Sequence, residues 1–285
     1  MRACEDRRLL WQAGPAVLLL LAFFVVPILA VGRISLYPAD RSFNVSGWSL
    51  RHYAKFFGDP FYLGVLWDTV WFGLLVTLVT LLVGFPLGYS LARMEGRARR
   101  WRVAVVILPL TLSLVVNVFG WLVILGGGGL VNRALTAAGL VDAPLRLLFN
   151  RTAVVVVLAH TFLPFQVLSI MSVIAQIDPA LEEAAANLRA GWWTTLRRVI
   201  LPLAWPGIVA GSTLVFILTI SAFVTPRLVG GARVQMLGSM IYEQTVVVLN
   251  WPFGGAMSFV LLALALVLVA LANRTVGARF FAGRR

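Results

Sequence analysis

Six long stretches without any Asp, Glu, Lys or Arg residue are the feature that most constrains the fold of this 285-residue chain. A helix needs about 20 consecutive apolar residues to cross the hydrocarbon core of a bilayer, and each stretch reaches that length. We therefore expect an all-α polytopic membrane protein in which residues 1–285 form a single transmembrane domain. The expected spans are residues 9–32, 69–92, 103–126, 152–177, 203–226 and 252–273.

The composition supports a membrane protein. Apolar residues make up 60% of the chain and the mean hydropathy is +0.92, whereas soluble domains average about 45–50% apolar residues. The net charge of +13 would suit nucleic acid, but the basic residues lie between the apolar stretches. We expect membrane lipid, and not nucleic acid, to be their partner, because topology and anionic headgroups account for that placement.

The first span could also be read as a secretory signal. Its uncharged run from residue 9 to residue 32 is longer than the usual signal core of about 7–15 residues, and no convincing cleavage site follows. We expect a retained helix. Six spans then place both termini on one side, and that side carries most of the 24 Lys and Arg residues. The positive-inside rule predicts that the termini and residues 178–202 are cytoplasmic.

The charged segment 178–202 separates the fourth and fifth spans. Asp178 followed by Pro179 is typical of a helix start, and Glu182 and Glu183 suit the positive end of the helix dipole. We expect two short helices joined by a bend, the second closed by Pro202 and Pro206, which together form a rigid projection for a partner. An apolar stripe on the first helix is predicted from Leu181, Ala184, Ala185 and Leu188.

Several kinds of chemistry are missing from the sequence. Lys55 is the only lysine and no glycine-rich segment precedes it, so there is no P-loop. The two histidines, His52 and His160, belong to no metalloprotease or nucleophile motif, and Cys4 is the only cysteine. We expect no catalytic residue, no metal site and no cofactor.

His160 is the only Asp, Glu, Lys, Arg or His residue within an expected span. A proton relay normally uses several ionisable groups in the membrane, so we expect His160 to be neutral and hydrogen-bonded to another helix. A transporter with neither an ATP site nor a relay must take its energy from a partner. The same shortage of charges disfavours a stand-alone secondary carrier or channel.

The segment 178–202 contains a pattern that identifies a family by resemblance. It consists of Glu183, Ala184, Ala185, Leu188, Ala190, Gly191, Leu201 and Pro202. This pattern resembles the cytoplasmic signature of binding-protein-dependent ABC importer permeases, whose fold is called MetI-like. Segments 47–57, 221–231, 241–244 and 250–261 are similar to the spermidine/putrescine branch, so the resemblance covers nearly the whole chain.

The resemblance implies a non-enzymatic subunit of the bacterial inner membrane. It implies two copies of an ABC ATPase, a second permease subunit and an extracytoplasmic solute-binding protein as partners. Polyamines are the expected solute, with ferric iron, sulfate and aminophosphonate as alternatives. A scaffold or receptor would leave the signature unexplained. The residues expected to couple the chain to the ATPase are Glu183, Ala184, Ala185, Leu188, Arg189, Ala190, Gly191 and Pro202.

Arg189 departs from the signature, which has glycine at this position. Arginine costs about 1 kcal/mol or more if the backbone must be left-handed there. Three explanations stay open: Gly191 takes over the bend, Arg189 pairs with a carboxylate of the ATPase, or the coupling helix is weakened.

A polyamine would favour carboxylates beside aromatic rings. Two such pairs lie near the outer ends of spans two and six, Asp68 with Trp67 and Glu243 with Tyr242. One hypothesis is that one of these pairs contacts the solute. An interfacial charge without a role in binding is the alternative for each carboxylate, and the sequence favours it.

Overall fold

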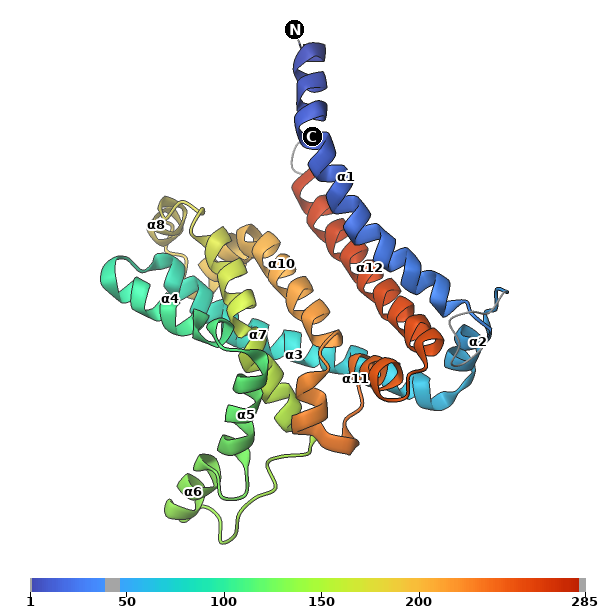
Figure 1. The fold of residues 1–285 in the computed structure, drawn as a ribbon. Helices are drawn as coiled ribbons and strands as arrows, with labels where there is room; N and C mark the ends of the chain where they lie inside the picture. Colours follow the sequence, from blue (N-terminus) through green and yellow to red (C-terminus); the bar gives the residue numbers. More distant parts are fainter. Residues whose placement is uncertain (1, 39–46, 282–285) are drawn as a thin grey trace. The chain divides into compact units, whose positions relative to one another are not determined.

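The computed structural model of the chain describes residues 2–38 and 47–281, and every regular element in these ranges is helical (Figure 1). Six helical stretches are long and apolar enough to cross a membrane, which confirms the predicted all-α architecture with six spans. Residues 39–46, which follow the first expected span, lie outside the described residues. The six stretches are Val17–Ser35, Pro60–Arg93, Leu114–Ala137, Arg151–Ile174, Trp192–Ile220 and Trp251–Arg274.

Twelve α-helices and four shorter helical turns make up the described chain. The turns are the π turns Leu196–Ile200, Pro226–Gly230 and Glu243–Val247 and the 3₁₀ turn Gly231–Arg233. The α-helices are α1 (Arg2–Ser35), α2 (Arg51–Gly58), α3 (Pro60–Arg93), α4 (Gly96–Thr111), α5 (Leu114–Leu125), α6 (Leu130–Ala137), α7 (Arg151–Ile174), α8 (Ala180–Asn187), α9 (Trp192–Thr195), α10 (Leu201–Ile220), α11 (Leu237–Tyr242) and α12 (Trp251–Phe281).

The chain divides into two compact units. The first comprises the described parts of Met1–Leu63 together with Ile241–Val260, and the second those of Gly64–Met240 and Leu261–Arg285. In the first unit α1 packs on the beginning of α12 so closely that a Cβ at Gly32 would lie 2.9 Å from the Phe259 ring. The short helix α2 joins this unit through aromatic contacts, such as the edge-to-face pair of Tyr62 and Phe253 at 5.0 Å.

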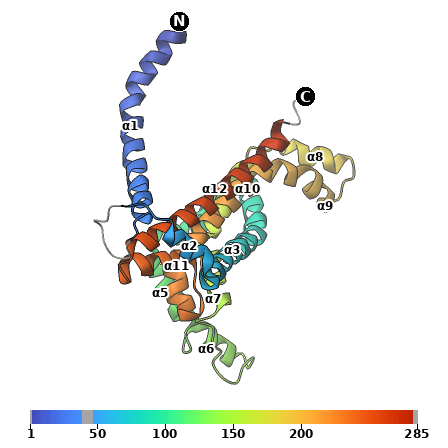
Figure 2. The same cartoon turned by 90° about the vertical axis from the view of Figure 1, so that its right-hand side faces the viewer.

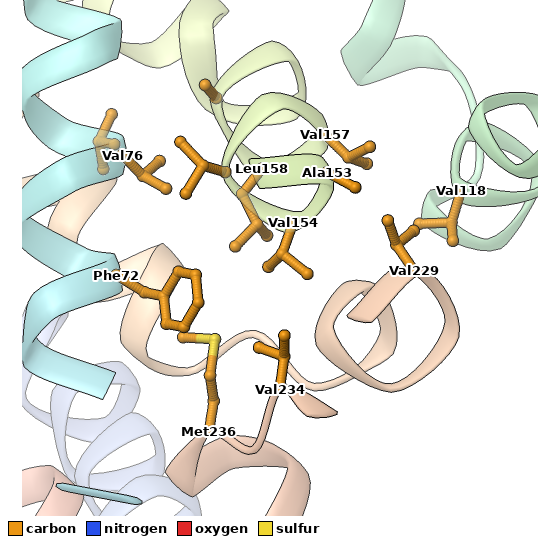
Figure 3. Close-up of a cluster of buried hydrophobic side chains, with 13 residues drawn as sticks. Phe72, Val76, Val118, Ala153, Val154, Val157, Leu158, Val229, Val234 and Met236 are labelled. Atoms are coloured by element: carbon orange, nitrogen blue, oxygen red, sulfur yellow. The ribbon is translucent and has the colours of Figure 1, made fainter. Parts of the chain in front are cut away.

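The core of the second unit is built around α7. Figure 3 shows side chains of α7 meeting Phe72 and Val76 of α3, Val118 of α5 and the segment 226–236. A second cluster continues along α7 toward α8, where Ile170, Ile174 and Ile177 pack with the helix that leads into α10. The central helix is therefore buried because three other elements cover it.

Glycines let the helices of the second unit approach one another. A Cβ at Gly88 of α3 would lie 3.0 Å from Ile170, and one at Gly207 of α10 would lie 2.8 Å from the carbonyl oxygen of Ser169. Gly84 and Gly211 lie on either side of the buried Gln166 side chain in the same way. Small residues at these positions bring the backbones together, as is usual in membrane helix pairs.

The stretch 103–126 is not one helix. α4 ends at Thr111, α5 begins at Leu114, and the backbone between them is extended, with ψ of 144° at Leu112. The hydropathy of an uncharged run does not show where a helix breaks, so it did not predict this one. The local sign in the sequence is Pro109, which lies in the last turn of α4.

The fifth span also differs from expectation. The second helix of segment 178–202 was expected to be closed by Pro202 and Pro206, but α9, the π turn Leu196–Ile200 and α10 follow one another without interruption. The expectation of a separate second helix was wrong. In a regular α-helix the proline ring would press on the carbonyl of Arg198, and the wider π turn directly before α10 changes the hydrogen-bond spacing at this point.

Candidate functional site

The helix α8 begins at Ala180, one residue after Pro179, the first helical position that the sequence predicted. The Asp178 side chain accepts a hydrogen bond from the backbone N–H of Ala180 at 2.9 Å, and Pro179 follows it without needing a donor. Glu182 and Glu183 both lie in the first turn. Figure 2 shows α8 beside α9, so the two helices form a short projection of the second unit.

The end of α8 lies at Arg189, whose φ is +57°. Its N–H donates to the Ala186 carbonyl at 2.8 Å, and the N–H of Ala190 donates to the Ala185 carbonyl at 3.0 Å. This pair of bonds is the helix ending that usually has glycine in the left-handed position. Gly191 has a φ of −66°, so the idea that Gly191 takes over the bend was wrong.

The surface of α8 is apolar and exposed. Leu181 and Leu188 are 45% and 85% exposed, and Trp192 and Trp193 next to them are 57% and 69% exposed. Ala185 is the only buried residue of α8. Of the predicted apolar stripe, Ala185 therefore packs on the described chain, whereas Leu181, Ala184 and Leu188 are exposed. An exposed apolar patch of this kind is typical of a protein interaction site.

The two glutamates of α8 have different surroundings. Glu183 is exposed, whereas Glu182 accepts a hydrogen bond from the Tyr89 hydroxyl at 2.7 Å and one from Arg93 Nε at 2.9 Å. Arg93 also forms an ion pair with Glu182 through its Nη2 and donates from Nη1 to the Ile177 carbonyl at 2.9 Å. These contacts tie α8 to the end of α3.

Sequence reasoning did not find Tyr89 or Arg93. A signal was available, because Glu182 precedes the buried Ala185 by three residues and so shares its face of the helix. Which residue of another helix would meet that face depends on packing.

Pro202, which was expected in the loop 178–202, lies in the first turn of α10.

The two carboxylates proposed for a solute also have different surroundings. Asp68 of α3 forms an ion pair with Arg151, the first residue of α7, at 2.8 Å, while Trp67 is 68% exposed. Glu243, in the first unit, is exposed and begins the π turn that follows Tyr242. Asp68 is therefore already neutralised by a basic residue, which fits the interfacial role that the sequence favoured.

His160 has the cross-helix hydrogen bond that the sequence predicted. Trp121 of α5 donates from its indole Nε1 to His160 Nδ1 of α7 at 3.2 Å. An acceptor nitrogen carries no proton, so this arrangement suits the neutral imidazole. Among the described residues, no three His, Cys, Asp or Glu side chains lie close enough together to hold a metal ion.

Six helices long and apolar enough to cross a membrane, with an exposed helical projection between the fourth and fifth, place the chain in the class of polytopic membrane proteins. The chain belongs to the family of binding-protein-dependent transport system inner membrane components, whose sequence profile matches residues 84–279. It is accordingly an inner-membrane permease component of a binding-protein-dependent transport system. This confirms the resemblance identified from segment 178–202.

Curated relatives match over most of their length. The chain is 33% identical over 259 residues to the spermidine/putrescine transport system permease protein PotB of Haemophilus influenzae, covering 90% of each chain. It is 32% identical over 243 residues to PotB of Escherichia coli, covering 85% of this chain and 88% of that protein.

Among solved structures, the fold is similar to a chain in the crystal structure of a bacterial alginate ABC transporter in complex with an alginate pentasaccharide-bound periplasmic protein. The TM-score is 0.75 with 19% sequence identity, and 96% of each chain is covered. At that identity the similarity shows the fold alone.

Proposed function

We propose that this permease carries a polyamine such as spermidine or putrescine across the inner membrane as a single transmembrane domain. The observation that carries the proposal is the 33% identity to a spermidine/putrescine permease over 90% of both chains. Ferric iron, sulfate and an aminophosphonate are the alternative solutes. If one of these were the solute, the partner binding protein would bind that solute and not a polyamine.

The proposed assembly contains a second permease subunit, two copies of an ABC ATPase and an extracytoplasmic binding protein. The large exposed apolar surface of the spans supports a membrane partner and lipid contact: Phe23 of α1 is 76% exposed, and Val123 of α5 is 70% exposed. The exposed stripe of α8 supports a soluble partner on the cytoplasmic side, where we place both termini.

We propose that α8 and the bend after it bind the ATPase. The exposed residues Glu183, Ala184, Leu188 and Arg189 would contact the partner directly. Ala185, Ala190 and Gly191 would shape the projection, because Ala185 is buried and the other two lie in the bend. Pro202 would act within the fifth span, since helical structure continues from α9 to α10. A displacement of Trp192 by the ATPase would therefore move the whole span.

For solute contact we propose Glu243 with Tyr242 ahead of Asp68 with Trp67, because Arg151 already neutralises Asp68. Replacing Glu243 by Gln should weaken polyamine uptake more than replacing Asp68 by Asn. Unchanged uptake in both variants would remove both pairs from the solute path.

Reconstitution tests the function. The purified permease pair, ATPase and binding protein are placed in liposomes, and uptake of radiolabelled spermidine is measured with and without ATP. We expect uptake that requires both ATP and the binding protein, with competition by putrescine but not by sulfate or ferric iron. Uptake by this chain alone, without the ATPase, would instead indicate a secondary carrier.

A further inference from the structure

We propose that Glu182, Arg93 and Tyr89 form a link that passes the movement of α8 to α3, the second membrane span. The inference rests on the proposed role of α8 in binding the ATPase. It assigns Glu182 and Arg93 as positioning residues that connect the ATPase-binding segment to a membrane helix distant from it in sequence.

The contacts occupy both oxygens of the Glu182 carboxylate. Oε2 accepts from Tyr89 at 2.7 Å, and Oε1 accepts from Arg93. The remaining guanidinium nitrogen of Arg93, Nη1, donates to the carbonyl of Ile177. Ile177 belongs to the connection between α7 and α8. One guanidinium therefore fixes both the helix α8 and the backbone that leads into it.

The link is partly buried, with the side chains of Arg93 and Glu182 20% and 22% exposed. Bonds between a guanidinium and a carboxylate are stronger and more directional than neutral ones, because both groups are charged and their geometries match. Limited exposure also reduces screening by water and salt. These properties suit a contact that must transmit force.

Little else attaches α8 to the membrane helices. Its only buried residue is the small Ala185. The helix begins after Asp178, whose side chain bonds the Ala180 N–H, and ends at the left-handed Arg189. Without the link α8 could turn about these two ends while the spans stayed in place. On the α9 side no such link is needed, because the helix runs directly into α10.

The receiving helix is suited to carry the movement. Arg93 is the last residue of α3, and Tyr89 lies one turn before it. Tyr89 packs against the cluster of Ile170, Ile174 and Ile200, and Gly88 lets α3 contact Ile170 closely. A displacement at Arg93 is therefore passed to a helix that is packed against α7, not to a loose end.

The test measures solute molecules transported per ATP hydrolysed in the reconstituted assembly. The variants are Glu182→Gln, Arg93→Lys and Tyr89→Phe, with Glu95→Gln as the matched control because Glu95 is exposed in the neighbouring connection. We expect uptake per ATP to fall about tenfold for Glu182→Gln and Arg93→Lys, the factor expected when a charge-assisted hydrogen bond is lost. Tyr89→Phe should have a smaller effect, and Glu95→Gln none.

Binding of the ATPase, measured by co-purification, should stay at the wild-type level in all four variants. The exchange Glu182→Arg with Arg93→Glu should recover part of the lost uptake per ATP. An unchanged ratio in the link variants, even with a lower protein yield, would overturn the proposal, because a purely structural contact changes yield and not coupling. An equal loss in Glu95→Gln would overturn it as well.

The two proposals can fail separately. If the wild-type assembly shows no uptake that depends on ATP and the binding protein, the proposed function fails. If the wild type transports and the link variants keep its ratio, only the link fails.

Discussion

Arg189 holds a left-handed backbone conformation, with a φ of +57°, at the position where the resemblance to the importer signature led us to expect glycine. The hydrogen bonds that end α8 need this conformation, and the bend is therefore built with an unfavourable residue. Its side chain is exposed, which leaves the guanidinium available for a carboxylate of the proposed partner. Strain that persists at a site of this kind favours a functional role for the residue.

Replacing Arg189 by Gly should stabilise the protein by about 1 kcal/mol, because glycine has no Cβ to clash in the left-handed region. Thermal unfolding of the detergent-solubilised protein measures the change. The matched control is Ala186→Gly in the regular part of α8, which should destabilise by about 0.5–1 kcal/mol. Lower stability of Arg189→Gly would show that contacts of the arginine side chain stabilise the protein by more than the left-handed backbone destabilises it.

Glu183 is the exposed member of the glutamate pair. Replacing it by Arg should abolish uptake while the protein remains inserted, since the changed charge faces the proposed partner and not the core. Membrane content by immunoblot and ATP hydrolysis by the assembly are measured together with uptake. Stimulated hydrolysis that persists unaltered in this variant would contradict the role of Glu183.

At the scale of elements, the contact of α10 with α7 depends on glycine. A Cβ at Gly207 would meet the Ser169 carbonyl at 2.8 Å and Val173 at 2.9 Å, whereas a Cβ at Gly120 of α5 would have nothing within 4 Å. Backbone atoms cannot rotate away as a side chain can. The contact fixes how the fifth span lies on the buried fourth.

Gly207→Ala should therefore destabilise the protein by about 1–3 kcal/mol, the usual cost of overpacking. Gly120→Ala should be neutral or stabilising by up to about 1 kcal/mol, because alanine loses less conformational freedom in a helix. Unfolding in mixed detergent micelles compares the two. An equal change in the free energy of unfolding for both variants would show that the close contact between α7 and α10 does not contribute to stability.

The helical elements also show which parts of the site the sequence could predict. The start of α8, its two glutamates and its apolar stripe follow from local spacing, and the structure has them within one residue of the expected positions. The continuation of α9 into α10 through a π turn was not predicted, because Pro202 ordinarily breaks a helix. The surrounding packing, with Ile200 and Ala204 fully buried, overrides that local preference.

At the scale of the whole molecule, the orientation in the membrane remains a prediction. Cys4 is the only cysteine in the sequence, so a thiol reagent can report the side on which the N-terminus lies. In spheroplasts a membrane-impermeant maleimide should label the wild-type chain only after permeabilisation. The control carries Cys4→Ser with Ala138→Cys, in the segment between α6 and α7, and should be labelled without permeabilisation. Labelling of Cys4 in intact spheroplasts would reverse the topology.

The sequence alone determined the number of spans, the helical class, the family and the position of the projection, because each depends on hydrophobic length or on spacing within one segment. Only the tertiary structure decided that Glu182 faces α3 while Glu183 faces outward, and that Asp68 pairs with Arg151. These pairs join residues more than eighty positions apart. Their partners are chosen by the way α3, α7 and α10 pack, and no local pattern of residues contains that choice.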